Sequence, residues 1–209
     1  MSTIENATTI NNVVNTENVE TVSAPQEARK ISNDAKSKAS TDIKDLILVA
    51  ILLAAGAVLK LTVASFLSFA GMKPNFIIAM YCLAIILIKP KFGKAIGIGL
   101  LAGLICQIPL LNATPVVNIP SELVGAAVCG LLIFMPMRIA GKVDINPFVT
   151  TFVSTVASGY TFAIIVGLMN GIALPTIFAM YAVMVFGTAA MNAILVQMLV
   201  PVLRKTRKE

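Results

Sequence analysis

The sequence contains no histidine among its 209 residues, and charged side chains make up only 12% of the chain. Without histidine, the most common proton shuttle near pH 7 and a frequent metal ligand are both missing. The three cysteines, Cys82, Cys106 and Cys129, each lie inside an apolar run without C-x-x-C spacing, which favours simple packing. We therefore expect no metal site and no cofactor.

Motifs of hydrolytic enzymes are also missing. The sequence has no G-x-x-x-x-G-K-[ST] loop, no H-E-x-x-H and no G-x-S-x-G. ATP hydrolysis by this chain, and enzymatic activity in general, are therefore not expected. The basic residues, which give a pI near 9.4, lie between apolar runs instead of alternating with aromatic residues on one face. A nucleic-acid partner is therefore not expected either.

Hydrophobic residues are abundant instead. They make up 57% of the chain, and the mean hydropathy is +0.89, which a soluble domain of this size could not bury. The composition predicts an all-α membrane protein with six transmembrane helices over residues 43–204. The second and third apolar segments are short, so five spans with one re-entrant segment is the alternative. The expected segments lie at roughly 45–64, 73–88, 95–111, 121–139, 147–169 and 177–203.

The basic residues indicate how these segments are oriented. All but two of the 16 Lys and Arg lie in the N-terminal tail, after the second and fourth segments, and at the C-terminus. By the positive-inside rule, both termini are cytoplasmic. The exceptions are Lys60, which we expect to extend to the outer interface, and Lys73. Residues 1–42, rich in Asn, Thr, Ser and Glu, are predicted to form a disordered cytoplasmic tail.

Two charged residues are candidates for an outer binding site. Lys73 precedes Pro74 at the start of the second segment, where a helix N-terminus would also attract a substrate carboxylate. The alternative role for this lysine is an anchor at the interface. Glu122 is the one acid within the spans. It is interpreted either as a residue of the first helical turn, after an N-cap at Ser121, or as a functional group that contacts a substrate ammonium.

Other polar residues could line the same cavity. Asn112 and Asn118 belong to the connection before the fourth segment, and Tyr81 lies inside the second segment. Small residues recur at helical spacing in two further segments, and we interpret both stripes as interior packing faces. These stripes are Ala95, Gly99 and Gly103, and Thr151, Ser154, Thr155 and Ser158.

Some of these residues form a pattern seen in a known family. Gly71-Met72-Lys73-Pro74-Asn75-Phe76 opens an apolar segment, followed by Ile88-Lys89-Pro90 and a Gly-rich third segment. This pattern resembles the bacterial tryptophan-transporter family, which is similar to the substrate-binding S components of energy-coupling-factor (ECF) transporters. The resemblance implies a six-helix domain in the bacterial cytoplasmic membrane that takes up tryptophan or a related solute, with Asn75 in the site.

The resemblance also implies partners. S components dock on a shared transmembrane subunit through an Ala-x-x-x-Ala face, which Ala50 and Ala54 match here. ATPase subunits bound to that transmembrane subunit power the transport. The leading hypothesis is therefore the substrate-binding subunit of an ATP-driven importer. One alternative is an autonomous ion-coupled carrier. Another, of a different class, is a structural or assembly protein without a ligand.

Overall fold

The structure is a computed structural model that describes residues 42–63, 66, 74–111, 114–139 and 143–206. The chain divides into two units, Met1–Leu46 and Ile47–Glu209. Of the first unit, the described residues 42–46 are helical, and the contacts discussed below all lie within the second. The tail predicted for residues 1–42 lies outside the described residues except for Asp42, where the first helix begins.

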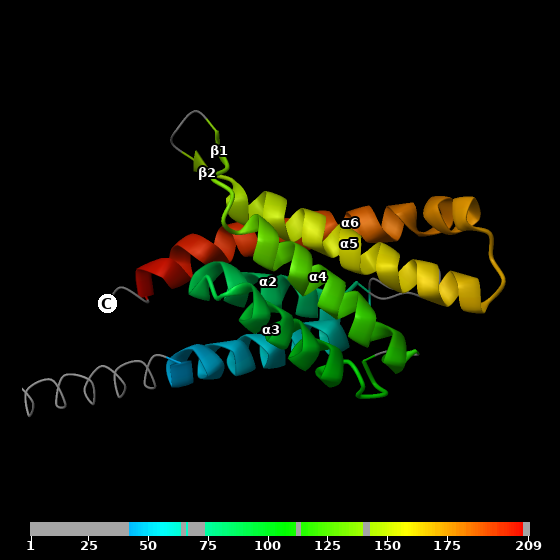
Figure 1. The fold of residues 1–209 in the computed structure, drawn as a ribbon, viewed down its shortest axis with the longest axis horizontal. Coiled ribbons are helices and arrows are strands. Elements are labelled where there is room, and N and C mark those ends of the chain that lie inside the picture. Colours follow the sequence, from blue (N-terminus) through cyan, green and yellow to red (C-terminus); the bar gives the residue numbers. More distant parts are fainter. Residues whose placement is uncertain (1–41, 64–65, 67–73, 112–113, 140–142, 207–209) are drawn as a thin grey trace, which may run out of the picture. The chain divides into compact units, whose positions relative to one another are not determined.

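The described part of the chain is built from six α-helices (Figure 1). The 3-10 turn η1 (Pro115–Val117) leads into α4, and a small antiparallel hairpin pairs β1 (Arg138–Ile139) with β2 (Val143–Asp144). The predicted helical class is thus confirmed, and the six helices lie where the apolar segments were expected. They are the first helix (Asp42–Val63), α2 (Phe76–Ile88), α3 (Phe92–Ile105), α4 (Asn118–Leu132), α5 (Asn146–Met169) and α6 (Leu174–Thr206).

The helices differ in whether they are long enough to cross a membrane. Four apolar stretches have sufficient length: Asp42–Val63, Pro115–Leu132, Asn146–Met169 and Leu174–Thr206. Helices α2 and α3 have 13 and 14 residues. At about 1.5 Å of rise per residue they extend roughly 20 Å, which is less than the hydrocarbon thickness of about 30 Å. The chain is therefore a multi-pass membrane protein, and the predicted count of six spans depends on α2 and α3.

Helix α2 forms the centre of the second unit. Eleven of its residues, from Phe76 to Ile86, are buried, and α3, α4, α5 and α6 all pack against it. A helix that is apolar on every side is stable only when other elements surround it. The last residue of the helix is Ile88. It is followed by Lys89, whose φ of 50° is left-handed, and by Pro90, which cannot continue a helix.

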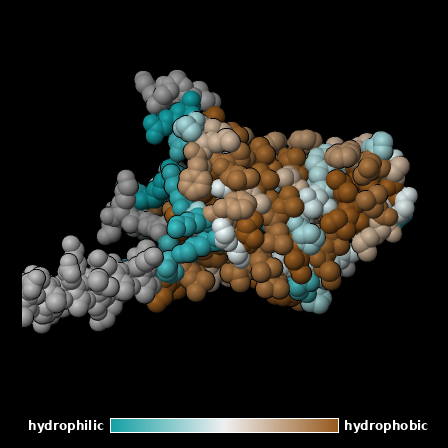
Figure 2. Space-filling model, in the orientation of Figure 1, coloured by the Kyte–Doolittle hydropathy of each residue, from teal (hydrophilic) through white to brown (hydrophobic). Residues whose placement is uncertain are grey.

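The outer surface of the helices is mainly apolar. Large side chains such as Ile51, Leu131, Val183 and Met198 are exposed. Figure 2 shows hydrophobic surface along the sides of the helices, with hydrophilic surface concentrated at the end that carries the β1–β2 hairpin. Apolar side chains that would be unfavourable in water are compatible with lipid, and a helix satisfies its own backbone there.

Candidate functional site

Glu122 is fully buried and does not lie at the end of a helix. Helix α4 begins at Asn118, so Glu122 belongs to its second turn and is 0% exposed. The predicted N-cap at Ser121 is therefore wrong, and the Ser121 hydroxyl instead donates to the Asn118 carbonyl at 3.1 Å. The helix starts earlier than expected because Pro120 falls in its first turn, where a backbone N–H has no helical partner anyway.

Two side chains from other segments reach one oxygen of the Glu122 carboxylate. The Asn75 amide, directly before α2, donates a hydrogen bond to Oε1. The Cys106 thiol, at the end of α3, lies 3.8 Å from the same oxygen. The second oxygen, Oε2, is buried and has no hydrogen-bond partner among the described residues. The carboxylate thus has one oxygen held by protein groups and one available as an acceptor.

Lys60 is part of the same site. We expected this lysine to extend to the outer interface, but it is only 2% exposed, and it interacts electrostatically with Glu122. The reason is its position one turn after Gly56, where a Cβ atom would lie 3.0 Å from the Ile77 backbone. This close approach turns the lysine face of the first helix toward α2. Buried ionisable groups in a membrane are costly and are retained for function by default.

Tyr81 reaches the site from α2. Its ring is fully buried, and its hydroxyl lies against Gly125, where any Cβ would collide with it. The same space is bordered by Ser158 of α5, whose Cβ would be 2.9 Å from a Cβ at Gly125. The hydroxyl makes no hydrogen bond of normal geometry within the described residues. Gly125 therefore provides the space that lets a phenol oxygen extend between α4 and α5.

Helices α5 and α6 complete the site from the other side. The Asn192 amide of α6 donates to the Asn75 carbonyl at 3.0 Å and to the Thr155 hydroxyl at 3.4 Å. Thr151, Ser154, Thr155 and Ser158 are all buried, which confirms the predicted interior face of α5. Asn192 was missed in the sequence, although an amide within an apolar helix is itself a signal of an interior polar contact.

Six buried polar atoms in the described part of the chain lack a hydrogen-bond partner. Native proteins rarely leave such groups unsatisfied, so each one requires an explanation. They come from α2, α4, α5 and α6 or the residue next to them. One belongs to Glu122 itself, and three belong to the side chains of Asn75, Tyr81 and Asn192 described above. The atoms are Asn75 Oδ1, Tyr81 Oη, Glu122 Oε2, Thr151 Oγ1, Ser154 Oγ and Asn192 Oδ1.

The predicted stripe of small residues on α3 packs against α4, the helix that carries Glu122. Ala95, Gly99 and Gly103 are buried, as expected. A Cβ at Gly99 would lie 2.9 Å from the Glu122 carbonyl oxygen and would collide with Ala126, and one at Gly103 would lie 3.0 Å from the Ile119 backbone. The absence of a side chain at Gly99 and at Gly103 lets α3 and α4 pack closely, which fixes the backbone that carries Glu122.

A comparison with known families bears on what this site does. The chain matches the family model described as Tryptophan transporter TrpP over residues 42–208, from the start of the first helix onward. The chain belongs to the tryptophan transporter TrpP family. It is therefore a membrane transport protein and not an enzyme. None of the curated proteins and none of the solved structures matches it.

Within this TrpP family member, the predicted site residues are only partly brought together. Asn75, Tyr81 and Glu122 converge, as described above. The Asn118 amide is buried but donates to the carbonyls of Thr114 at 3.3 Å and Pro115 at 3.2 Å, so its nitrogen is used by the turn before α4. Lys73 and Asn112 lie outside the described residues.

The predicted docking residues stand apart from the site. Ala50 and Ala54 of the first helix are both exposed, one turn apart on the same side of the helix. Two small side chains on an exposed side leave room for another helix to approach closely.

Proposed function

We propose that this TrpP family member binds tryptophan or a related zwitterionic solute in the site around Glu122 and carries it across a bacterial cytoplasmic membrane. The observation that carries the proposal is the fully buried Glu122 carboxylate, with one oxygen held by Asn75 and the other unpartnered among the described residues. An anion in that setting is suited to an ammonium group, because a charge-assisted hydrogen bond strengthens away from water.

The charges of a zwitterionic substrate assign the other contacts. Its ammonium group binds Glu122 and also donates hydrogen bonds to the Tyr81 hydroxyl and the Asn75 amide oxygen. Its carboxylate binds a lysine. This is Lys73, as the sequence predicts, or Lys60, a candidate because it is buried and interacts electrostatically with Glu122. Asn112 and Asn118 stay predicted contacts from the connection before α4.

The energy source for uptake is inferred from the sequence motifs and from the exposed face of the first helix. Because it has no ATP-binding motif and exposes Ala50 and Ala54, we propose that it is the substrate-binding subunit of an ECF-type importer, docked through this face on a transmembrane subunit that works with ATPases. A second candidate is an autonomous ion-coupled carrier. The specific observation in its favour is that Lys60 and Glu122 are both buried and interact electrostatically, since ion-coupled carriers keep ionisable groups within the membrane.

The first experiment measures thermal stabilisation of the purified protein across amino acids and common vitamins. A ligand at 100 times its dissociation constant raises the free energy of unfolding by about 2.7 kcal/mol. Tryptophan or a close analogue should give this effect. No stabilisation by any of these solutes would favour the structural protein without a ligand. Comparing Lys60→Met with Lys73→Met then identifies the carboxylate partner, because only the variant lacking it should lose affinity.

A second experiment separates the energy sources. Uptake is measured in cells with the proton gradient dissipated and ATP maintained, and again after co-expressed ECF-type subunits are removed. An importer driven by ATPases keeps its uptake in the first case and loses it in the second. The opposite pattern would identify an ion-coupled carrier.

A further inference from the structure

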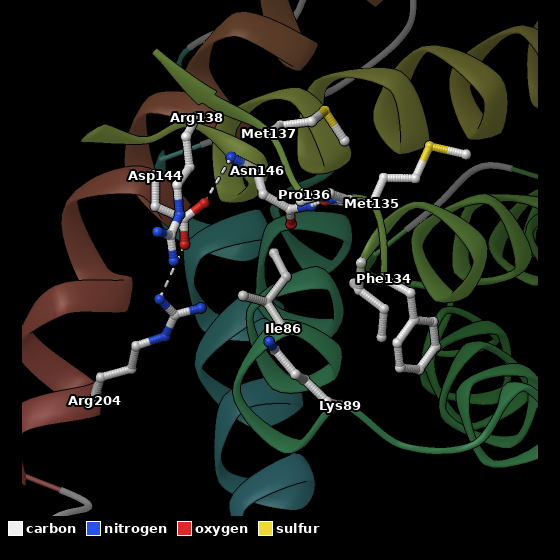
Figure 3. A pocket seen from close by; sticks show the side chains of 11 residues that line it. Ile86, Lys89, Phe134, Met135, Pro136, Met137, Arg138, Asp144, Asn146 and Arg204 are labelled. Carbon is white, nitrogen blue, oxygen red and sulfur yellow. Dashed lines mark hydrogen bonds and ion pairs between the residues drawn. The ribbon is translucent and has the colours of Figure 1, made fainter. Parts of the chain in front are cut away.

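A cavity of about 270 Å³ lies where α2 and α4 end and α5 begins (Figure 3), whereas Glu122 belongs to the second turn of α4. Its floor is apolar, formed by the buried residues Ile86 and Ile133. Three basic residues from three different segments line it: Lys89 after α2, Arg138 in β1 and Arg204 in α6. The cavity therefore combines an apolar base with a cationic rim.

The charges around this cavity are not balanced. Asp144 is the one acidic residue among those lining it, and both of its carboxylate oxygens are engaged. Oδ2 accepts from Arg204 at 3.2 Å, and Oδ1 accepts from the Asn146 backbone N–H at 3.1 Å. Lys89 and Arg138 have no ion-pair partner among the described residues. Two cations are thus left to attract an anion.

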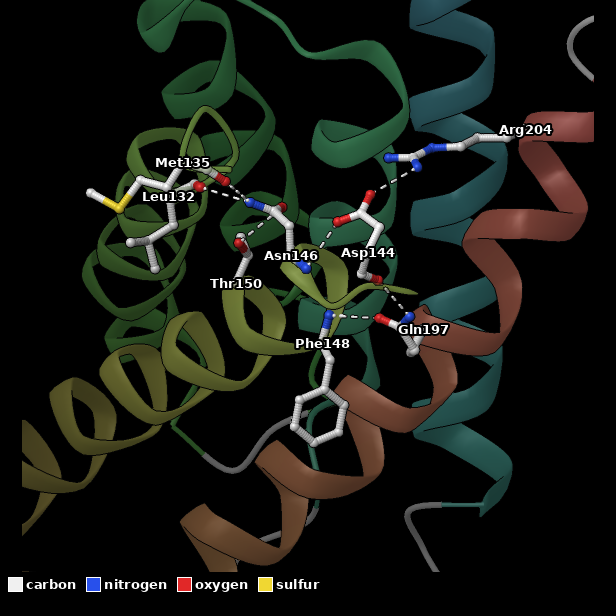
Figure 4. A network of polar contacts seen from close by, with 8 residues as sticks. All are labelled: Leu132, Met135, Asp144, Asn146, Phe148, Thr150, Gln197 and Arg204. Carbon is white, nitrogen blue, oxygen red and sulfur yellow. Dashed lines mark hydrogen bonds and ion pairs between the residues drawn. The ribbon is translucent and has the colours of Figure 1, made fainter. Parts of the chain in front are cut away.

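The wall of the cavity is held in place by a polar network (Figure 4). Gln197 of α6 donates to the Asp144 carbonyl at 2.9 Å and accepts from the Phe148 N–H at 3.0 Å. The Asn146 amide donates to the carbonyls of Leu132 at 3.1 Å and Met135 at 2.6 Å. These bonds tie the turn between α4 and α5 to α6, so the cationic rim is preorganised.

The backbone conformation of Lys89, the residue after α2, is a further indication of a binding site. Lys89 has a left-handed φ of 50° and precedes Pro90. An L-residue with a side chain is unfavourable in that region, and a residue before proline is normally extended. Such unusual backbone conformations cluster at sites that bind ligands. Here the conformation is adopted by a lysine on the cavity rim.

We propose that this cavity binds the phosphate of an anionic phospholipid headgroup. Phe134 and Met135, which also line the cavity, are 62% and 54% exposed, which suits contact with acyl chains. The volume lies just below the roughly 300–1,000 Å³ of pockets that enclose a whole drug-sized ligand, so it fits a headgroup whose chains stay outside. Basic pockets between helices at the cytoplasmic side are suited to such headgroups.

The test compares short-chain phosphatidylglycerol, phosphatidylcholine of the same chain length, and inorganic phosphate, each titrated into the detergent-solubilised protein and detected by native mass spectrometry. Phosphatidylglycerol should bind best. Lys89→Gln/Arg138→Gln should bind it about 25-fold more weakly, at about fivefold for each cation. The matched control is Lys91→Gln/Lys205→Gln, which removes two exposed charges that do not line the cavity and should keep wild-type binding.

Equal loss in both double variants would overturn the proposal in favour of diffuse surface charge, and equal binding of the two lipids would overturn it as well. Phosphate that binds and fully displaces the lipid, with no advantage for phosphatidylglycerol, would make this a site for free phosphate. A second measurement uses the wild-type protein, so that its result does not depend on whether the variants fold. Phosphatidylglycerol carrying a photoreactive group near its headgroup should label residues 134–137, and labelling confined to other segments would contradict the assignment.

Discussion

The Asn75 side chain donates its hydrogen bond to Glu122, and this contact joins the residue before the most buried helix, α2, to the second turn of α4. Because Asn75 also offers its backbone carbonyl to Asn192 of α6, one residue links three helices. The site around Glu122 is therefore part of the packing of the fold, and changes to it have effects on stability as well as on binding.

Changing Asn75 to Asp should place two carboxylates in contact and lower the thermal stability of the protein. The amide that donates to Glu122 is replaced by a group that repels it. Adding Glu122→Gln should restore the contact with donor and acceptor exchanged, so the double variant should recover about 0.5–3 kcal/mol of coupling energy. Melting curves of both single variants and the double variant measure this. Additive effects of the two changes would show that the residues do not interact.

Gly99→Ala should destabilise the protein by about 1–3 kcal/mol, the usual effect of overpacking, because the new methyl group would press on Ala126 and the Glu122 carbonyl. Ligand affinity should fall with it, since the backbone of Glu122 is displaced. Gly97→Ala is the matched control on the same helix: nothing lies within 4 Å of its Cβ position. That change should be neutral or stabilise by about 0.4–1 kcal/mol. Similar effects of the two substitutions would contradict the tight α3–α4 contact.

The docking face can be tested separately from binding. Ala50→Leu/Ala54→Leu adds bulk on an exposed face, and leucine is compatible with both lipid and helix. The variant should fold and bind ligand like the wild type, but should lose uptake and co-purification of a partner subunit. Ala55→Leu, at an exposed alanine about 100° around the helix from Ala54, should leave uptake intact. Normal uptake by the double variant would mean that this face does not dock a partner.

The predicted orientation can be tested with single cysteines in a chain freed of Cys82, Cys106 and Cys129. Ala173→Cys, in the exposed turn between α5 and α6, should react with an impermeant reagent applied to intact cells. Lys91→Cys, between α2 and α3, should react only after the cells are opened, because the basic connections stay inside. The reverse pattern would invert the topology, and labelling of both positions would exclude six spans.

Much of the fold is predictable because its signals are local. Apolar length and the basic residues between segments located all six helices, and the spacing of Gly99 and Ser154 identified interior faces. The burial of Glu122 was not predicted, because it depends on where α4 begins, and the fourth segment was expected to start at residue 121 and not at Asn118. The partners of the site could not be predicted either. The hydrogen bond between Asn192 and Asn75 joins positions far apart in the chain, and no local sequence pattern predicts it.

The burial of Lys60 could not be predicted from the sequence either. A lysine near the end of an apolar segment is usually explained by extension to the interface, and the sequence does not say which side of the helix faces the protein. The close approach at Gly56 decides that, and it is visible only once the first helix and α2 are packed together.

The most direct test is calorimetric titration of the purified protein with tryptophan, together with indole-3-propionate, which lacks the ammonium group. We expect saturable tryptophan binding that weakens in Glu122→Gln by about 1.5–3 kcal/mol, the range for a hydrogen bond to a charged group, or roughly 10- to 150-fold. Indole-3-propionate should bind weakly, and equally to the wild type and the variant. Unchanged tryptophan affinity in a folded Glu122→Gln protein would contradict the assignment of Glu122 as the ammonium ligand.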